Sequence, residues 1–147
     1  MNIAIGCDHG GFGLKKAIVP IVEQAGHTVV DLGCFSEEAV DYPDFADRVC
    51  AAIGEGHCQR GILICGTGIG MSIAANKVAG IRAAVCHDRY TADMARRHND
   101  ANVLAIGARV VSAELAREIV DVFLSTAFEE GGRHGRRVEM LNALDDR

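Results

Sequence analysis

A cysteine followed by a glycine-rich loop is the part of this sequence best suited to chemistry. Cys65 ends an apolar run and is followed by the sequence GTGIG, in which Gly66, Gly68 and Gly70 alternate with larger residues. Glycines permit positive φ angles and add no side chain, so several backbone N–H groups can point into one concavity and hold a phosphate or an oxyanion. A tight turn between a strand and a helix, with no ligand, is the alternative. The adjacent cysteine favours a functional loop.

Cys65 is the candidate reactive group beside this loop. A thiolate is stabilised at the start of a helix, where it can act as a nucleophile or a base. The chain contains no C-x-x-C, so the usual spacings of zinc sites and thiol–disulfide centres are absent. The remaining cysteines are interpreted as small, buried, apolar residues: Cys7, Cys34, Cys50, Cys58 and Cys86.

The glycine loop does not fit the common nucleotide-binding motifs. Its spacing is G-x-G-x-G rather than G-x-G-x-x-G, and it follows the third apolar run of the chain instead of the first. The first apolar run leads into Asp8, which would place a carboxylate where a pyrophosphate should lie. No Gly-Lys-Ser/Thr follows the loop, so the Walker pattern is absent as well.

Polar residues elsewhere could complete a site, although each also has an ordinary structural interpretation. Asp8 and His9 follow the first apolar run, and Asp8 could instead cap the next helix. His98 precedes the fifth run and could be a solvated residue at a helix end. Arg133 and Arg137 are four residues apart, which would place them on one face of a helix.

The sequence says less about the roles of Arg109 and of the four other histidines. Arg109 follows the fifth apolar run and could contribute to an anion site or be a surface charge. The other histidines are interpreted as solvated: His27, His57, His87 and His134.

Five short apolar runs alternate with stretches of helical periodicity, and these elements must position the candidate residues. The expected strands are residues 2–7, 27–32, 61–65, 81–86 and 102–106, and the expected helices are residues 14–25, 43–53, 71–77, 90–97, 113–124 and 137–144. Strands that are apolar throughout and separated by helices are typical of a parallel sheet covered on both faces. We therefore predict one doubly wound, Rossmann-like α/β domain over residues 1–147, with a five-stranded parallel sheet and an extra C-terminal helix. Ligands of such folds bind beyond the carboxyl ends of the strands.

The composition narrows the possible partners. The chain has 147 residues, of which 49% are hydrophobic, and its net charge is −5. A nucleic-acid-binding protein would normally show a basic stripe, and a membrane span needs about 18 consecutive apolar residues. The sequence has neither, and no apolar leader precedes the first strand, so we expect a cytoplasmic protein with reduced thiols that binds neither nucleic acid nor membrane.

Several motifs together resemble those of the ribose-5-phosphate isomerase B family, which also includes galactose-6-phosphate and allose-6-phosphate isomerases. The motifs are GCDHGG (6–11), DYP (41–43), CGTGIGMSIAANK (65–77), HNDAN (98–102) and GGRH (131–134). The resemblance covers essentially the whole chain. One branch of the family uses a glutamate of the loop as its base, but Ile69 stands at that position here. The chain is therefore similar to the cysteine branch.

The resemblance implies a role for each matched residue. Cys65 would shuttle a proton between C1 and C2 of the sugar, and Thr67 would orient the sugar. Asp8 and His98 would open the furanose ring. The other implied contacts are backbone N–H groups of the loop with the enediolate oxygen, from Gly66 through Gly68 and Gly70 to Ser72; His9, Arg109, Arg133 and Arg137 with the phosphate; and Tyr42 and Asn99 with the sugar.

The implied reaction interconverts an aldose phosphate and a ketose phosphate, and ribose 5-phosphate and ribulose 5-phosphate are the expected pair. It requires a base, a cradle for the enediolate and a ring-opening group, but no metal and no redox cofactor. A different substrate (allose 6-phosphate, galactose 6-phosphate or a tetrose phosphate) and a non-catalytic phosphosugar-binding module are the alternatives. The resemblance also implies a homodimer, or a dimer of dimers, whose sites use residues from both subunits.

Overall fold

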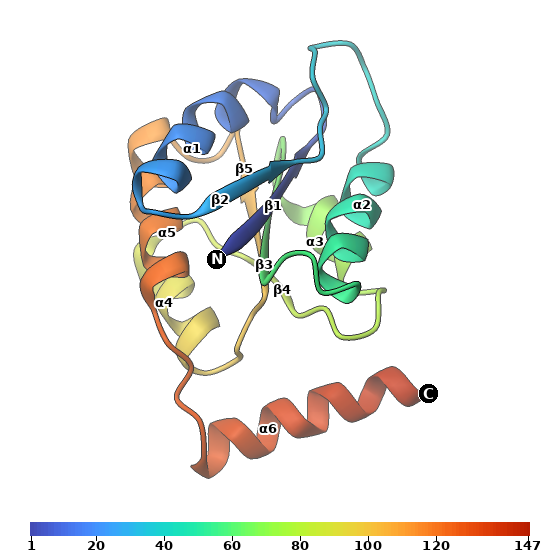
Figure 1. The fold of residues 1–147 in the computed structure, drawn as a ribbon, viewed down its shortest axis with the longest axis vertical. Helices are drawn as coiled ribbons and strands as arrows, with labels where there is room; N and C mark the ends of the chain where they lie inside the picture. The colour runs from blue at the N-terminus through green and yellow to red at the C-terminus, as the bar shows by residue number, and fades with distance from the viewer.

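A single parallel sheet forms the centre of the computed structural model, which describes all 147 residues (Figure 1). The strands are β1 (Asn2–Cys7), β2 (Thr28–Asp31), β3 (Arg60–Cys65), β4 (Ala83–Val85) and β5 (Val103–Gly107). Their order across the sheet is β2-β1-β3-β5-β4, and every pairing is parallel. The strand order reverses between β1 and β3, so the carboxyl ends of these two strands flank the place where doubly wound folds bind ligands.

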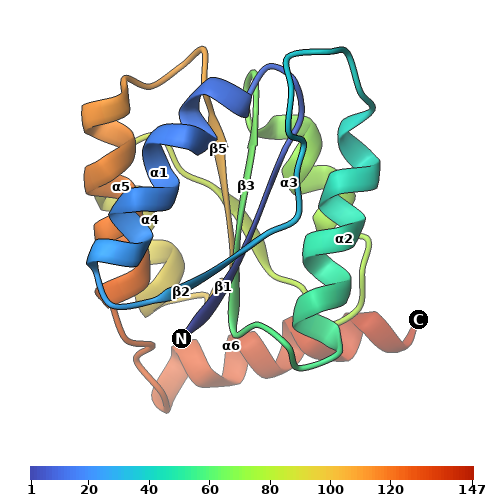
Figure 2. The same ribbon diagram turned by 45° about the horizontal axis from the view of Figure 1, so that its top comes forward.

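Helices cover both faces of the sheet (Figure 2). They are α1 (Phe12–Gln24), α2 (Tyr42–Gly54), α3 (Ile69–Ala75), α4 (Arg89–Arg97), α5 (Ala113–Ser125) and α6 (Gly132–Ala143), followed by a 3₁₀ turn at Leu144–Asp146. On one face α5 packs against both α1 and α4, and on the other α2 packs against α3. The fold is therefore the predicted doubly wound α/β arrangement with an additional C-terminal helix.

The central strands are apolar because both of their faces are covered. All but the first residues of β1 and β3, and all residues of β5, are buried. Ile5, Leu63, Ile106 and Phe123 belong to the large side chains that have no exposed surface. No helix in the structure has the length and apolar character needed to cross a membrane. This close-packed core fixes the strand ends on which the site residues are mounted.

The predicted boundaries agree with the structure to within about two residues for all elements except one. α6 begins at Gly132 rather than near Arg137. The φ angles of Gly131 and Gly132 are +84° and +57°, so these two glycines make the turn into the helix. Glycine is a weak helix former, so the sequence there indicated a loop. Arg133 and Arg137 both lie on α6, which confirms that they share a helix.

α6 lies outside the two helical layers and crosses the edge of the sheet where the strands begin (Figures 1 and 2). Val138 is its only buried residue. The start of α6 meets the end of α4, where the rings of His98 and His134 stack. Near its other end, Asn142 accepts a hydrogen bond from the Arg82 guanidinium at 3.0 Å. α6 is thus held mainly at its two ends.

Candidate active site

Cys65 is the last residue of β3, and its side chain is buried at the carboxyl edge of the sheet. Its residue exposure is 5%, and its Sγ accepts a hydrogen bond from the backbone N–H of Gly68 at 3.1 Å. Such a bond stabilises negative charge on the sulfur. The loop therefore folds back over the thiol, and the thiol faces the glycine segment that the sequence singled out.

The loop after Cys65 presents unpaired backbone donors. The N–H groups of Gly66, Thr67, Gly70 and Met71 have no hydrogen-bond acceptor in the chain. The resemblance implied that backbone N–H groups between Gly66 and Ser72 hold the enediolate oxygen, and three other N–H groups of this segment already have acceptors within the chain. They are bound internally: Gly68 to the Cys65 sulfur, Ile69 to the Thr67 hydroxyl at 3.3 Å, and Ser72 to the Gly68 carbonyl at 3.1 Å. The four free donors are enough to hold an oxyanion or a phosphate.

Two of the loop glycines are required by close packing. Gly68 has a φ of +77°, and a Cβ added there would come within 3.0 Å of the Ile106 backbone. A Cβ on Gly70 would come within 2.6 Å of the Tyr42 ring. Tyr42 therefore lies directly against the loop. Larger residues at either position would displace the cradle.

Asp8 and His9 lie next to the loop, at the end of β1. The Asp8 carboxylate is 8% exposed by residue and accepts a hydrogen bond from the N–H of Gly11 at 3.1 Å. This bond closes the turn before α1 but does not cap the helix, whose N-cap residue Gly11 has no side-chain cap, so the capping alternative is wrong. The second carboxylate oxygen has acceptor capacity to spare. The Nδ1 atom of His9 accepts a hydrogen bond from the N–H of Val40 at 3.2 Å. In the neutral ring this leaves Nε2 as the donor.

Arg109 lies over the same loop. Its backbone N–H donates to the Gly66 carbonyl at 3.0 Å. A Cβ added to Gly66 would lie 2.9 Å from Nη1 of Arg109, and one added to Gly10 would lie 3.5 Å from Nη2. The guanidinium therefore spans the ends of β1 and β3, and this exposed cation favours a negatively charged ligand at the carboxyl edge.

The remaining predicted site residues lie at the opposite edge of the sheet. His98 follows the last residue of α4, Asn99 comes next, and both precede the start of β5. Arg133 and Arg137 lie on α6, which crosses that edge (Figure 2). The predicted residues thus form two groups. We call them the carboxyl-edge cluster (Asp8, His9, Tyr42, Cys65, Thr67, Arg109 and the loop) and the amino-edge cluster (His98, Asn99, Arg133 and Arg137).

His134 belongs with the amino-edge cluster, and its interpretation as a solvated residue was wrong. Its ring stacks on that of His98, with the ring centres 3.9 Å apart and the planes 7° from parallel. Burial, the neighbouring His98 and the positive charge of Arg133 lower the pKa of His134 below its usual value. The sequence did not indicate this pair, because the two histidines are brought together only by the path of α6.

His98, Glu129 and His134 are the residues whose donor atoms come closest to a possible metal site. One donor atom from each lies within 4.8 Å of the others. The Glu129 carboxylate, however, already accepts a hydrogen bond from Arg97 at 3.3 Å. Arg133 and Arg137 add positive charge around His134. This concentration of cations disfavours a metal ion and favours an anion.

His87 was also interpreted as solvated, and the structure corrects this. The residue is half-buried at the end of β4, and its Nε2 accepts a hydrogen bond from the N–H of Gly107 at 3.3 Å. Gly107 packs against Thr67, since a Cβ added there would lie 2.7 Å from the Thr67 backbone. His87 therefore supports the far side of the glycine loop.

All six cysteines are free and buried, which confirms that the five other than Cys65 are buried residues. Burial raises the pKa of Cys7 to about 12 and the pKa of both Cys50 and Cys86 to about 11. Burial also raises the pKa of Cys58. These four cysteines are neutral thiols at physiological pH and are poor nucleophiles.

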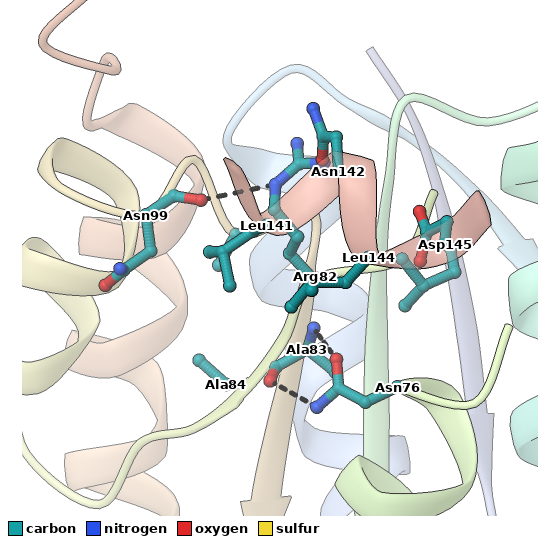
Figure 3. Close-up of a pocket in the computed structure, with 11 residues that line it drawn as sticks. Asn76, Arg82, Ala83, Ala84, Asn99, Leu141, Asn142, Leu144 and Asp145 are labelled. Carbon is teal, nitrogen blue, oxygen red and sulfur yellow. Dashed lines mark hydrogen bonds between the residues drawn. The ribbon is translucent and has the colours of Figure 1, made fainter. Parts of the chain in front are cut away.

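A cavity of about 450 Å³ lies between α6 and β4 at the amino edge (Figure 3). Its walls combine apolar residues such as Leu141 and Leu144 with the polar groups of Arg82, Asn99 and Asn142. The cavity therefore borders the amino-edge cluster and leaves part of α6 without a partner in the chain. Arg82, which the sequence did not indicate because it stands in an apolar run, is the main polar group of this region.

Comparison with known proteins agrees with this geometry. The family model described as Ribose/Galactose Isomerase matches residues 3–141. A ribose-5-phosphate isomerase B of Escherichia coli is 54% identical over 146 residues, which cover 99% of this chain and 97% of that protein. A D-erythrulose-4-phosphate isomerase of Pectobacterium atrosepticum is 51% identical over 133 residues, 90% of this chain and 88% of that protein.

Solved structures agree as well. A ribose-5-phosphate isomerase B of Clostridium thermocellum superposes with a TM-score of 0.96 at 53% identity, covering 99% of this chain and 98% of that one. A Mycoplasma genitalium ribose-5-phosphate isomerase B with bound ribulose-5-phosphate has a TM-score of 0.94 at 42% identity, with 99% and 97% coverage. The likeness covers nearly the whole chain, and this chain belongs to the ribose/galactose isomerase family.

Proposed function

We propose that this protein interconverts ribose 5-phosphate and ribulose 5-phosphate. The observation that carries the proposal is the carboxyl-edge cluster, in which one thiol lies against a loop with four unpaired backbone donors. An aldose–ketose isomerase needs a base and an oxyanion cradle within reach of the same two carbons. Relatives that share half or more of the residues are ribose-5-phosphate or four-carbon sugar-phosphate isomerases.

The reaction follows from these groups. The Cys65 thiolate removes the proton from C2 of the open-chain aldose, and the electron pair of the C–H bond moves to form an enediolate whose charge rests on O1. The free N–H groups of the loop stabilise that charge. The thiol then returns the proton to C1, and the proton of the C2 hydroxyl moves to O1, which leaves a ketone at C2, a hydroxyl at C1 and a regenerated thiolate. C2 is oxidised as C1 is reduced, so the balance needs no external redox partner.

The remaining residues bind and prepare the substrate. His98 and Asp8 open the furanose ring by moving a proton between the ring oxygen and the anomeric hydroxyl. His9, Arg109, Arg133 and Arg137 hold the phosphate. Thr67, Tyr42 and Asn99 contact the hydroxyl groups of the sugar. These assignments are part of the proposal.

The two clusters imply a site shared between subunits. They lie at opposite ends of the strands, and a strand of this length spans roughly 17–20 Å. A five-carbon sugar phosphate is much shorter than that. We therefore propose a homodimer, or a dimer of dimers, in which the carboxyl-edge cluster of one subunit meets the amino-edge cluster of the other. The exposed apolar side chains of α6 and the turn after it, Met140, Leu141 and Leu144, would be covered in that assembly.

Mixing two variants that each have low activity tests both the reaction and the shared site. Cys65→Ala and His98→Asn subunits, co-expressed with different tags, form hybrid dimers in which one site lacks both groups and the other is intact. Random pairing then restores roughly a quarter of the wild-type activity on ribose 5-phosphate. A mixture that stays inactive while hybrid dimers are present contradicts the shared site. A stable, fully active monomer in sedimentation would do the same.

A four-carbon sugar phosphate is the second candidate substrate, because the Pectobacterium relative acts on one. The decisive measurement is kcat/KM for ribose 5-phosphate, allose 6-phosphate, galactose 6-phosphate and a tetrose phosphate, without added metal. The highest value for ribose 5-phosphate supports the proposal. Binding without turnover on any of them would indicate a phosphosugar-binding module instead. A mechanism that depends on a free thiol suits a reducing compartment, so we place the protein in the cytoplasm.

A further inference from the structure

Arg82, at the start of the β4 region, makes an unusually large number of contacts with the loop that carries His98. Its Nε donates to the carbonyls of Asn99 at 3.2 Å and Asp100 at 3.1 Å. Its Nη2 donates to the Asp100 carbonyl at 2.9 Å and to the Asp100 carboxylate at 3.1 Å. Figure 3 shows the guanidinium turned towards the Asn99 carbonyl. The side chain thus holds the backbone immediately after His98.

The same guanidinium also holds α6. Its Nη1 atom donates to the side-chain oxygen of Asn142 at 3.0 Å, close to the C-terminal end of the helix. Each of the three guanidinium nitrogens therefore has a partner, and the side chain is only 19% exposed. Arg82 therefore connects the His98 loop to the C-terminal end of the helix that carries Arg133 and Arg137, as the stack of His98 on His134 does at the start of that helix.

The loop needs such support because its backbone is strained at Asp100. This residue has a φ of +46°, in the left-handed region that residues other than glycine seldom adopt. The Asp100 carboxylate lies between two cations, Arg82 at 3.1 Å and Arg96 at 2.9 Å. Arg96 holds the turn from the α4 side, and Arg82 holds it from the α6 side. Removing Arg82 would release the turn on the side that faces α6.

We infer that Arg82 is a positioning residue that fixes the ring-opening loop and the phosphate-binding helix relative to each other. The inference rests on the proposed function of His98, Arg133 and Arg137. Lysine could not replace it, because a single ammonium group cannot reach the loop carbonyls and Asn142 in the planar arrangement that the guanidinium provides. Arg82 thereby holds the amino-edge cluster in the position that faces the glycine loop of a second subunit.

Arg82 makes two sets of hydrogen bonds, one with the loop after His98 and one with Asn142 of α6, and two variants separate them. Arg82→Met removes both sets, whereas Asn142→Ala removes only the bond with α6. A third variant controls for stability. Arg60→Met is the matched control: Arg60 is also a partly buried arginine that donates to two carbonyls, those of Phe123 at 2.6 Å and Leu124 at 3.1 Å. It does not contact the His98 loop or α6 through any hydrogen bond. Both arginine variants are expected to lower Tm.

The values of kcat and KM distinguish a loss of positioning from a loss of stability. Arg82→Met should lower kcat on ribose 5-phosphate by about 10-fold or more and raise KM, and it should lose less kcat on a four-carbon sugar phosphate that cannot cyclise. Asn142→Ala should raise KM for both substrates and leave kcat near the wild-type value. Arg60→Met should leave kcat and KM unchanged. Equal kinetics in the two arginine variants at matched fractions folded would overturn the inference.

A measurement that is independent of activity separates this inference from the proposed function. The ring resonances of His98 and His134 in NMR report the stack between them, and Arg82→Met should shift both whereas Arg60→Met should shift neither. Unchanged histidine resonances in Arg82→Met would overturn the inference even if the enzyme is an isomerase. If the resonances shift in Arg82→Met but the wild-type protein turns over no sugar phosphate, the positioning role of Arg82 is retained and the proposed reaction is rejected.

Discussion

The two edges of the sheet are built in opposite ways. At the carboxyl edge, Cys65 is buried and the donors around it are backbone N–H groups fixed by strands and glycines. At the amino edge, the working groups are side chains on a loop and on a helix with one buried residue. In the proposed mechanism the step that makes and breaks C–H bonds belongs to the buried carboxyl edge, whereas the less buried amino edge contributes His98 to ring opening and Arg133 and Arg137 to phosphate binding. Variants at the two edges should therefore fail differently.

The largest effect is expected at the rigid edge. Cys65→Ala should lower kcat by at least ~10²-fold, since it removes the only base proposed for C2. Binding of the phosphosugar should change little, because no phosphate contact is lost. Steady-state kinetics and a direct binding measurement test this. Cys58→Ala, at another buried cysteine, is the control, and near-wild-type turnover in Cys65→Ala would mean that a different residue is the base.

Alkylation provides an independent check on Cys65. Cys7, Cys50, Cys58 and Cys86 have pKa values raised by burial, so they remain protonated in an assay between pH 7 and 8. The fifth, Cys34, is buried and its Sγ donates to the Ser36 carbonyl at 3.3 Å. We therefore expect a thiol reagent to inactivate the wild-type enzyme through Cys65, and bound substrate should protect it. Peptide mapping that places the label on another cysteine in the inactivated protein would contradict this.

A smaller and more selective loss is expected at the amino edge. His98→Asn should remove most activity on ribose 5-phosphate, about 10-fold or more, because the cyclic form must first be opened. It should retain a larger fraction on a four-carbon sugar phosphate, which cannot form the furanose. The comparison is kcat/KM on the two substrates for variant and wild type. Equal losses on both would remove the ring-opening role and leave the isomerase proposal in place.

The phosphate contacts should appear in KM rather than in kcat. A hydrogen bond to a charged group is worth roughly 1.5–3 kcal/mol, so Arg137→Ala should raise KM by about 10- to 100-fold. Arg136→Ala changes the neighbouring arginine of α6 and is the matched control, with a KM close to the wild-type value. If both variants have the same KM, the effect reflects net charge, and Arg137 has no specific contact with the phosphate.

The smallest effect concerns the stacked histidines. The pKa of His134 is lowered by burial, by His98 and by Arg133, so the unfolded chain takes up this proton at a higher pH than the folded protein. The associated stability is therefore complete above a pH of about 6.5 and is lost as the pH falls below that value. The decrease in Tm between pH 7 and pH 5.5 should be smaller in His134→Gln than in the wild type. A larger decrease in the variant would contradict the direction of the shift.

The sequence predicted the rigid edge better than the exposed one. The strands could be predicted because successive residues, such as Ile62, Leu63 and Ile64, are apolar, so both faces of the strand are apolar. The loop could be predicted because its cysteine and glycines are adjacent in the chain. At the amino edge the contacts join distant segments: His98 with His134, and Arg82 with Asn142. No local pattern encodes such pairs. Gly132 and Gly135 at the start of α6 indicated a loop, because glycine is a weak helix former. Contacts at the two ends of the helix override this low propensity, and no local pattern shows those contacts.

The shallow attachment of α6 also affects how the chain opens. A helix that buries only Val138, above a cavity of about 450 Å³, can separate from the body at a free-energy cost well below that of global unfolding. Its amide hydrogens should then exchange with solvent through a local opening, while those of β3 and β5 exchange only when the whole domain unfolds. A newly made subunit would thus carry Arg133 and Arg137 on a helix that the contacts at its two ends hold but that still opens locally, and a second subunit packed over that helix would suppress the opening.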